Sequence, residues 1–159
     1  MTKLKLLFLI SFFIIVCCNT KKTESPFIDN LKPGDTLTLK SEGSSCGEFG
    51  GNVEKIMIIK KGSDLQAIYY EDEIISPCDS FPFLKRKILI EKSKILTKND
   101  RVNVVKYIDN FLIITKPLTM PCYPEFNYEI ITKDTNITYW NCENNWWDFL
   151  TLKHELFDK

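Results

Sequence analysis

Residues 53–71, VEKIMIIKKGSDLQAIYYE, decide the fold of this chain. Residues 53–60 and 65–71 are rich in β-branched and aromatic side chains, which favour strands. Between them, Gly62 and Ser63 suit the two central positions of a type II′ turn, whose first residue needs a positive φ. The stretch therefore predicts an antiparallel hairpin in which the numbers of paired residues sum to about 125.

Strand patterns continue on both sides of this hairpin. Residues 36–40 alternate between apolar and polar side chains, which places Leu37 and Leu39 on one face of a strand. Residues 86–91 predict another strand, and residues 126–142 predict a second hairpin. An antiparallel sheet of five or six strands is expected.

Two helices are expected beside this sheet. Thr97 and Asp100 form a capping box at the start of the first helix. Its apolar stripe is expected to contain Val104, Val105, Ile108, Phe111 and Leu112. The second helix, residues 144–157, is expected to place Trp146, Phe149, Leu150 and Phe157 on one face, with Leu152 and Leu156 beside it. The fold class is therefore α+β, with two packed helices.

The N-terminal stretch has the pattern of a secretory signal. Lys3 and Lys5 precede an apolar run at residues 6–16, which is too short for a membrane-spanning helix. The chain then carries Cys17 and Cys18, at the place where a signal peptide is cut. Four outcomes are open for such a segment: lipidation of Cys18, lipidation of Cys17, plain secretion, and an uncleaved anchor.

The end of this run, residues 15–18, resembles a bacterial lipobox, with Ile15 and Cys17 in the positions before the cut. The resemblance implies that Cys18 is diacylated and becomes the first residue of the mature protein. We therefore expect a signal peptide at residues 1–17, the lipidated cysteine with a flexible tether at residues 18–34, and one domain at residues 35–159.

The charge balance argues against nucleic-acid binding. The whole chain has a net charge of zero, and loss of residues 1–17, which carry two lysines and no acid, leaves −2. Lysine outnumbers arginine 19 to 2, whereas sites that read phosphate usually favour arginine. A surface for nucleic acid or anionic lipid is not expected.

Four cysteines remain after the lipobox, namely Cys46, Cys78, Cys122 and Cys142. An even number in an exported chain predicts two disulfides. The hairpin register brings Cys46 and Cys78 to opposite sides of its open end, which makes this pair the first candidate. Cys122–Cys142 is then the remaining pair, although four cysteines allow three connectivities. The chain has no CxxC spacing and a single histidine, so no zinc, redox or other metal site is expected.

No motif carries a convincing catalytic pattern. Residues 43–47 match GxSxG, but a strand follows instead of the helix that a nucleophile elbow needs. Cys46 lies before a strand, so a thiol–imidazole pair with His154 is not favoured, and His154 is expected on a helix surface. The acidic run at residues 71–73 copies no calcium loop and is interpreted as a solvated turn.

Two tryptophans are the candidate binding residues. Trp146 and Trp147 belong to an aromatic-rich C-terminal part, and aromatic side chains can form platforms for sugars or anchors for proteins. On a helix the two point about 100° apart, so both cannot face the core centre. An exposed one would be the binding residue.

Several short motifs together carry a resemblance to a protein group. They are residues 45–47, the capping box at residues 97–100, Cys122, and the run from Cys142 through Trp146 and Trp147 to Leu156 and Phe157. This layout resembles small Bacteroidota-type lipoproteins of unknown function. The resemblance implies a compact α+β domain and supplies no activity. Such lipoproteins reach the cell surface with acidic residues after the cysteine; Lys21 and Lys22 favour the periplasmic side here.

The sequence thus predicts a non-enzymatic binding or accessory module, anchored in the envelope by its N-terminal lipid and needing no cofactor. Its partner is expected to be an envelope protein or a saccharide. The alternatives are an inhibitor or immunity-type protein acting through residues 41–52 or 120–125, and a small hydrolase. An enzyme should present His154 or paired carboxylates in a pocket, and a binder an exposed aromatic patch.

Overall fold

A computed structural model describes residues 25–43, 51–74, 85–115, 126–141 and 148–158. It contains one antiparallel sheet with the strand order β4-β3-β2-β1-β5-β6. The strands are β1 (Thr36–Gly43), β2 (Val53–Lys61), β3 (Asp64–Ile74), β4 (Arg86–Ile95), β5 (Phe126–Ile131) and β6 (Asn136–Asn141). The helices are α2 (Pro26–Asp29), α3 (Lys98–Ile114) and α4 (Asp148–Phe157). The α+β fold class and the six-stranded antiparallel sheet are confirmed.

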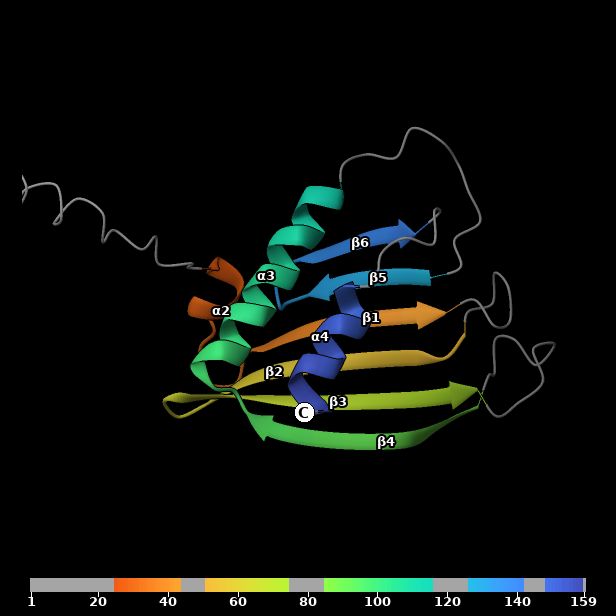
Figure 1. The fold of residues 1–159 in the computed structure, drawn as a ribbon, viewed down its shortest axis with the longest axis horizontal. Helices are drawn as coiled ribbons and strands as arrows, with labels where there is room; N and C mark the ends of the chain where they lie inside the picture. Colours follow the sequence, from red (N-terminus) through yellow and green to blue (C-terminus); the bar gives the residue numbers. More distant parts are fainter. Residues whose placement is uncertain (1–24, 44–50, 75–84, 116–125, 142–147, 159) are drawn as a thin grey trace, which may run out of the picture.

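The layers are simple. Helices α3 and α4 lie on one face of the sheet, and α2 lies at the end of the sheet where β1 begins (Figure 1). No helix lies on the opposite face in the part of the chain that the structure describes. The sheet therefore has one face packed in the core and one face without a helix, as antiparallel sheets allow.

The β2–β3 hairpin has the predicted register. Val53 pairs with Asp72 at one end and Lys61 pairs with Asp64 at the other, so each pair of residue numbers sums to 125. Gly62 has a φ of 66°, which a glycine adopts without steric strain. The register sends alternate residues to opposite faces, so Ile56 and Ile58 face the helices.

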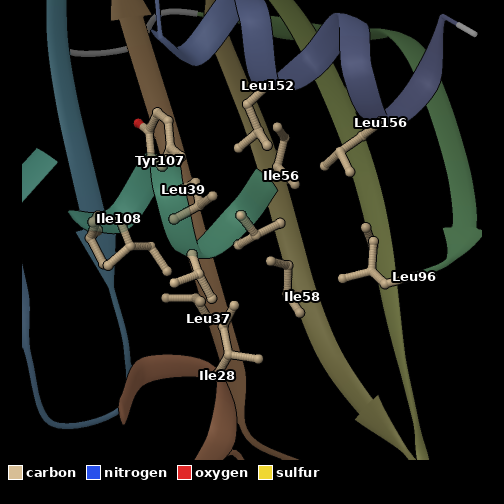
Figure 2. Close-up of a cluster of buried hydrophobic side chains, with 14 of the residues drawn as sticks. Ile28, Leu37, Leu39, Ile56, Ile58, Leu96, Tyr107, Ile108, Leu152 and Leu156 are labelled. Carbon is tan, nitrogen blue, oxygen red and sulfur yellow. The ribbon is translucent and has the colours of Figure 1, made fainter. Parts of the chain in front are cut away.

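The core fills the space between the sheet and the two long helices. Leu37, Leu39, Ile56 and Ile58 have no exposed surface, and Leu152 packs against them from α4 (Figure 2). Burial of each such side chain stabilises the fold by about 1.5–3 kcal/mol. The alternation predicted for residues 36–40 is confirmed.

Helix α3 starts with the predicted capping box. The Asp100 amide donates to Thr97 Oγ1 at 3.2 Å, and the Thr97 amide donates to an Asp100 carboxylate oxygen at 2.8 Å. The stripe from Val104 to Phe111 is buried as expected, but Leu112 is 40 % exposed. Leu112 lies near the last turn of α3, which extends past edge strand β6 (Figure 1).

Helix α4 buries a slightly different stripe from the predicted one. Phe149, Leu152 and Leu156 are buried, whereas Leu150 is 41 % exposed. Because the buried stripe follows positions i, i+3 and i+7 from Phe149, Leu150 points about 100° away from it. The placement of Leu150 on the packed face was wrong.

The packed part of the chain begins before Asp35, within the segment expected to be a tether. Ile28 of α2 and Leu31 belong to the core. A turn then leads into β1: Gly34 has a φ of 90°, and the Asp35 amide donates to the Lys32 carbonyl at 3.0 Å. Because these apolar side chains are buried in the core, residues 25–34 form part of the domain.

The outer strand β4 is irregular. Ile90 pairs with Glu71 and Ile88 pairs with Asp72, which leaves Leu89 as the extra residue of a β-bulge. The side chains of residues 88–90 are exposed. Strands β4 and β6 are the two edges of the sheet.

Asp100 makes the stability of the domain sensitive to acid. Burial alone would raise the pKa of its carboxyl group, but hydrogen bonds from Thr97 and the Lys94 ammonium hold the pKa below the usual value. The resulting stabilisation is complete above the unfolded pKa of about 3.9 and is lost as the pH falls through the lower folded pKa.

We expect Asp100→Asn to lower the free energy of unfolding by about 1 kcal/mol at neutral pH. The loss should shrink on acidification, since wild type then loses the same charge. Urea unfolding at several pH values measures this, with the exposed Asp109→Asn of the same helix as control. If acid lowered the stability of Asp100→Asn and of wild type equally, Asp100 would not be the source of the acid sensitivity.

Candidate functional site

A polar cluster lies beneath α4 at the rim of the core. The Tyr69 hydroxyl donates to Glu54 at 2.6 Å and lies 2.9 Å from a carboxylate oxygen of Glu71. Lys153 of α4 reaches the same Glu54 carboxylate at 2.5 Å and the Tyr69 hydroxyl at 3.3 Å. Because Glu54 and Glu71 are directly paired across β2 and β3, the cluster ties α4 to both strands.

The role of this cluster is to stabilise the fold. Burial, and then the neighbouring carboxylates of Glu54 and Glu71, raise the pKa of Tyr69, so its hydroxyl stays protonated. One hydroxyl proton serves one carboxylate at a time, and Lys153 compensates the charge of Glu54. The Tyr69 ring is 2 % exposed and packs on Phe157. The arrangement holds α4 in place.

Two groups from the sequence analysis are now placed. The His154 side chain is 69 % exposed, 3.8 Å from the Asp158 carboxylate, on the helix surface as predicted. The solvated turn expected at residues 71–73 was wrong, because these residues lie within β3. Glu71 and Asp72 are consecutive strand residues and point to opposite faces of the sheet. The acidic run therefore cannot converge on one calcium ion. Within the described residues, no group of three or more His, Cys, Asp or Glu side chains could hold a metal ion.

The remaining candidate residues lie outside the described residues. They are Cys18, Cys46, Cys78, Cys122, Cys142, Trp146 and Trp147. Of the two loops considered for an inhibitor, residues 120–125 and most of residues 41–52 also lie outside. No helix in the described ranges is long and apolar enough to cross a membrane.

The face of the sheet opposite α3 and α4 carries a second set of polar and apolar side chains, which we call the open face. Lys40, Lys55 and Tyr70 mark it, since they alternate with the buried residues of their strands. Its members are Thr38, Lys40, Glu42, Lys55, Met57, Ile59, Ile68, Tyr70, Asp72, Glu129, Ile131 and Trp140. Trp140 is 50 % exposed at the β6 edge of this face.

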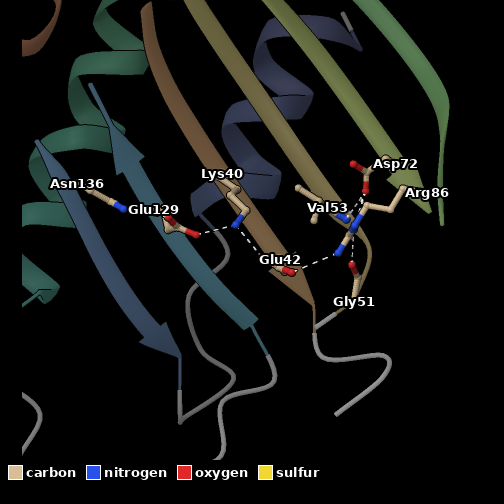
Figure 3. A network of polar contacts seen from close by, with 8 residues as sticks. All are labelled: Lys40, Glu42, Gly51, Val53, Asp72, Arg86, Glu129 and Asn136. Carbon is tan, nitrogen blue, oxygen red and sulfur yellow. Dashed lines mark hydrogen bonds and ion pairs between the residues drawn. The ribbon is translucent and has the colours of Figure 1, made fainter. Parts of the chain in front are cut away.

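A network of ion pairs crosses the open face (Figure 3). The Lys40 ammonium lies 2.7 Å from both Glu42 and Glu129. The Arg86 guanidinium donates to Asp72 at 2.8 Å and to the Gly51 carbonyl at 2.8 Å, and it lies 3.4 Å from Glu42. The network therefore links the outer strand β4 to β3, β1 and β5.

Partial burial of Lys40 would lower its pKa, but the hydrogen bonds and charges of Glu129 and Glu42 outweigh this effect and raise it. Lys40 is therefore a fixed cation. Arg86 lies beside Val53, which is 5 % exposed although it belongs to a strand position on the open face (Figure 3). The network thus holds its side chains in place before any partner arrives.

An apolar strip lies beside the network. Thr38 pairs with Met57 on one side and with Ile131 on the other, and Met57 pairs with Ile68. All of these side chains are partly exposed, as is Ile59 in the next row. Four adjacent strands therefore present a mostly apolar row to solvent, next to a row that contains Lys40, Lys55 and Glu129.

A groove of about 320 Å³ lies at the end of the sheet. One wall is α2 and the two residues after it, with Phe27, Asn30 and Leu31. The other wall is formed by Asp35, Thr36 and the β5–β6 turn at residues 132–135. We call it the α2 groove. Its volume is at the lower end of the range typical of small-molecule sites.

The open face and the α2 groove were not predicted from the sequence, although the sequence contains signals for both. Residues 56–59 are apolar at four consecutive positions, which indicates a strand that is apolar on both faces. Pro33 and Gly34 form a type II turn signal between α2 and β1. The partners of Lys40 and Arg86 could not be found without the strand order.

We expect Tyr69→Phe to lower the free energy of unfolding by about 1–3 kcal/mol, because Glu54 and Lys153 lose a buried hydrogen-bond partner. The neighbouring Tyr70→Phe is the matched control. Its hydroxyl makes no hydrogen bond within the described residues, so a change within about 0.5 kcal/mol is expected. The free energy of unfolding of both variants is measured in urea. An equal loss in the two variants would show that the Tyr69 hydroxyl adds no stability through the cluster.

Comparison with protein-family models, with curated proteins and with solved structures finds no match to this chain. The open face combines apolar and charged side chains, and the α2 groove has a volume in the small-ligand range.

Proposed function

We propose that the protein is a non-enzymatic, lipid-anchored binding module of the bacterial envelope that docks another envelope protein on its open face. The observation that carries this proposal is the apolar strip around Met57, which lies uncovered by any described helix beside a charged network. Contiguous apolar surface rimmed by polar side chains is typical of protein interaction sites.

The fixed charges of the open face favour docking. Lys40 and Arg86 are already held by carboxylates, so their side chains lose little conformational freedom when a partner binds. Such preorganisation leaves more of the free energy of apolar burial for affinity. It also fixes the orientation of the partner, because misplaced charges would meet fixed charges of the same sign.

Lys55 indicates the chemistry of the partner. It lies between Lys40 and Tyr70 in one cross-strand row. Lys40 has two carboxylate partners, whereas Lys55 has no ion pair within the described residues. We infer that the partner presents an apolar centre flanked by a carboxylate, which would neutralise Lys55 on docking.

The anchor is supported by the N-terminal pattern described above. In this proposal, Cys18 carries the lipid and the domain faces the periplasm. Cys46, Cys78, Cys122 and Cys142 form two disulfides, which would together contribute several kcal/mol by restricting the unfolded chain. The small hydrolase is disfavoured because His154 is 69 % exposed on a helix surface, where the Asp158 carboxylate lies 3.8 Å from it.

The anchor is tested by the intact mass of protein extracted from native membranes, with and without reduction before thiol alkylation. We expect a chain that starts at diacylated Cys18, with four cysteines that react only after reduction. A mature form with a freely reactive Cys46 would contradict the disulfides, and a chain that retains residues 1–17 would contradict the lipid anchor.

The docking surface is tested with a photo-crosslinking residue at Met57 in native cells, and with the same residue at exposed Lys106 on α3 as control. We expect one crosslinked envelope protein from position 57 and none from position 106. Lys55→Glu should weaken the purified complex about tenfold, the effect of a reversed contact charge. Lys98→Glu, on α3, should leave it unchanged.

The identified partner permits a stricter check. Replacing its carboxylate near Lys55 by a lysine should restore binding to the Lys55→Glu variant. Equal crosslinking from α3, or binding that does not change with the charge at position 55, would contradict the proposed docking surface.

A further inference from the structure

We propose that the α2 groove binds an uncharged oligosaccharide. The groove is separate from the open face: it is formed by α2, the start of β1 and the β5–β6 turn. The proposal therefore adds a ligand site to the docking surface and does not depend on it.

One wall of the groove is apolar. Phe27 is half-buried and packs against the core, and Leu31 is buried in that core. Pro26 extends this wall. A pyranose ring has a face of C–H groups that packs on an aromatic ring, so this wall suits a sugar as well as it suits an apolar ligand.

The other side of the groove is polar. Thr36, Lys133 and Asp134 line it, and Asn30 adds a polar group to the α2 wall. Within the described residues, the side chains of Asn30 and Asp134 make no hydrogen bond or ion pair to the protein. Sugar hydroxyls donate and accept, so they can satisfy both an amide and a carboxylate.

The turns that carry these groups are held by hydrogen bonds. The Thr132 amide donates to the Thr135 carbonyl at 2.7 Å, and the Asp134 amide donates to Thr132 Oγ1 at 3.3 Å. On the turn between α2 and β1, the Lys32 amide donates to the Asp35 carboxylate at 2.9 Å. Both walls are therefore ordered before a ligand arrives, which lowers the entropic cost of binding.

Other ligand classes fit the groove less well. Asp35 and Asp134 outnumber Lys133, which disfavours a phosphate or another anion. A calcium ion needs six to eight oxygen ligands, and no described cluster supplies three carboxylates. A wholly apolar ligand would desolvate Asp134 without a hydrogen bond in return. An uncharged oligosaccharide can pack its C–H groups on the apolar wall and form hydrogen bonds with the polar side.

The test is a titration of the purified protein with gluco-, manno-, galacto- and N-acetylglucosamine-configured tetraoses, monitored by saturation-transfer NMR and calorimetry. We expect at least one of them to bind at millimolar concentration or below. Asp134→Ala should weaken that binding about tenfold, since a hydrogen bond to a charged group is lost.

Two further variants separate the groove from the fold. Phe27→Leu keeps the apolar volume but removes the aromatic face, and it should weaken binding while the domain stays folded. Asp109→Ala, an exposed aspartate on α3, is the matched control and should bind as wild type does. No binding by any tetraose, binding that both groove variants leave unchanged, or tighter binding of inorganic phosphate in the same titration would overturn the proposal.

Discussion

The register of the β2–β3 hairpin is the constraint on which the rest of the structure depends. Its two-residue turn is possible because Gly62 adopts a positive φ, and the turn decides which residues face each way. A slip by one position would send Met57 and Lys55 into the core and expose Ile56. Burial of a lysine without a partner opposes that slip, so the chemistry of the two faces enforces the register.

Features encoded within a few residues could be predicted from the sequence. Gly62 and Ser63 define the turn, and Thr97 with Asp100 defines the start of α3; both were confirmed. The second hairpin followed from the same alternation of side chains. The turn and the cap depend on backbone angles and hydrogen bonds between neighbours, and the alternation depends only on which residues of a strand share a face.

Features that depend on distant parts of the chain could not be predicted in the same way. Helix α2 is short and weak as a sequence pattern, and it is held by the burial of Ile28 and Leu31 against the sheet. The ion pairs of Lys40 with Glu129 and of Arg86 with Glu42 require the placement of β5 and β4 relative to β1. The α2 groove likewise exists only because a turn and a helix from separate segments meet at one end of the sheet.

The bulge in β4 bears on how this domain avoids unwanted assembly. An exposed edge strand invites another chain to add to the sheet, and residues 88–90 are apolar enough to encourage it. The extra residue Leu89 breaks the regular spacing of main-chain donors and acceptors at that point, while Lys92 and Lys94 place charges along the remainder of the strand. Growth of the sheet into fibres through β4 is thereby discouraged, and the domain can be crowded together without polymerising through that edge.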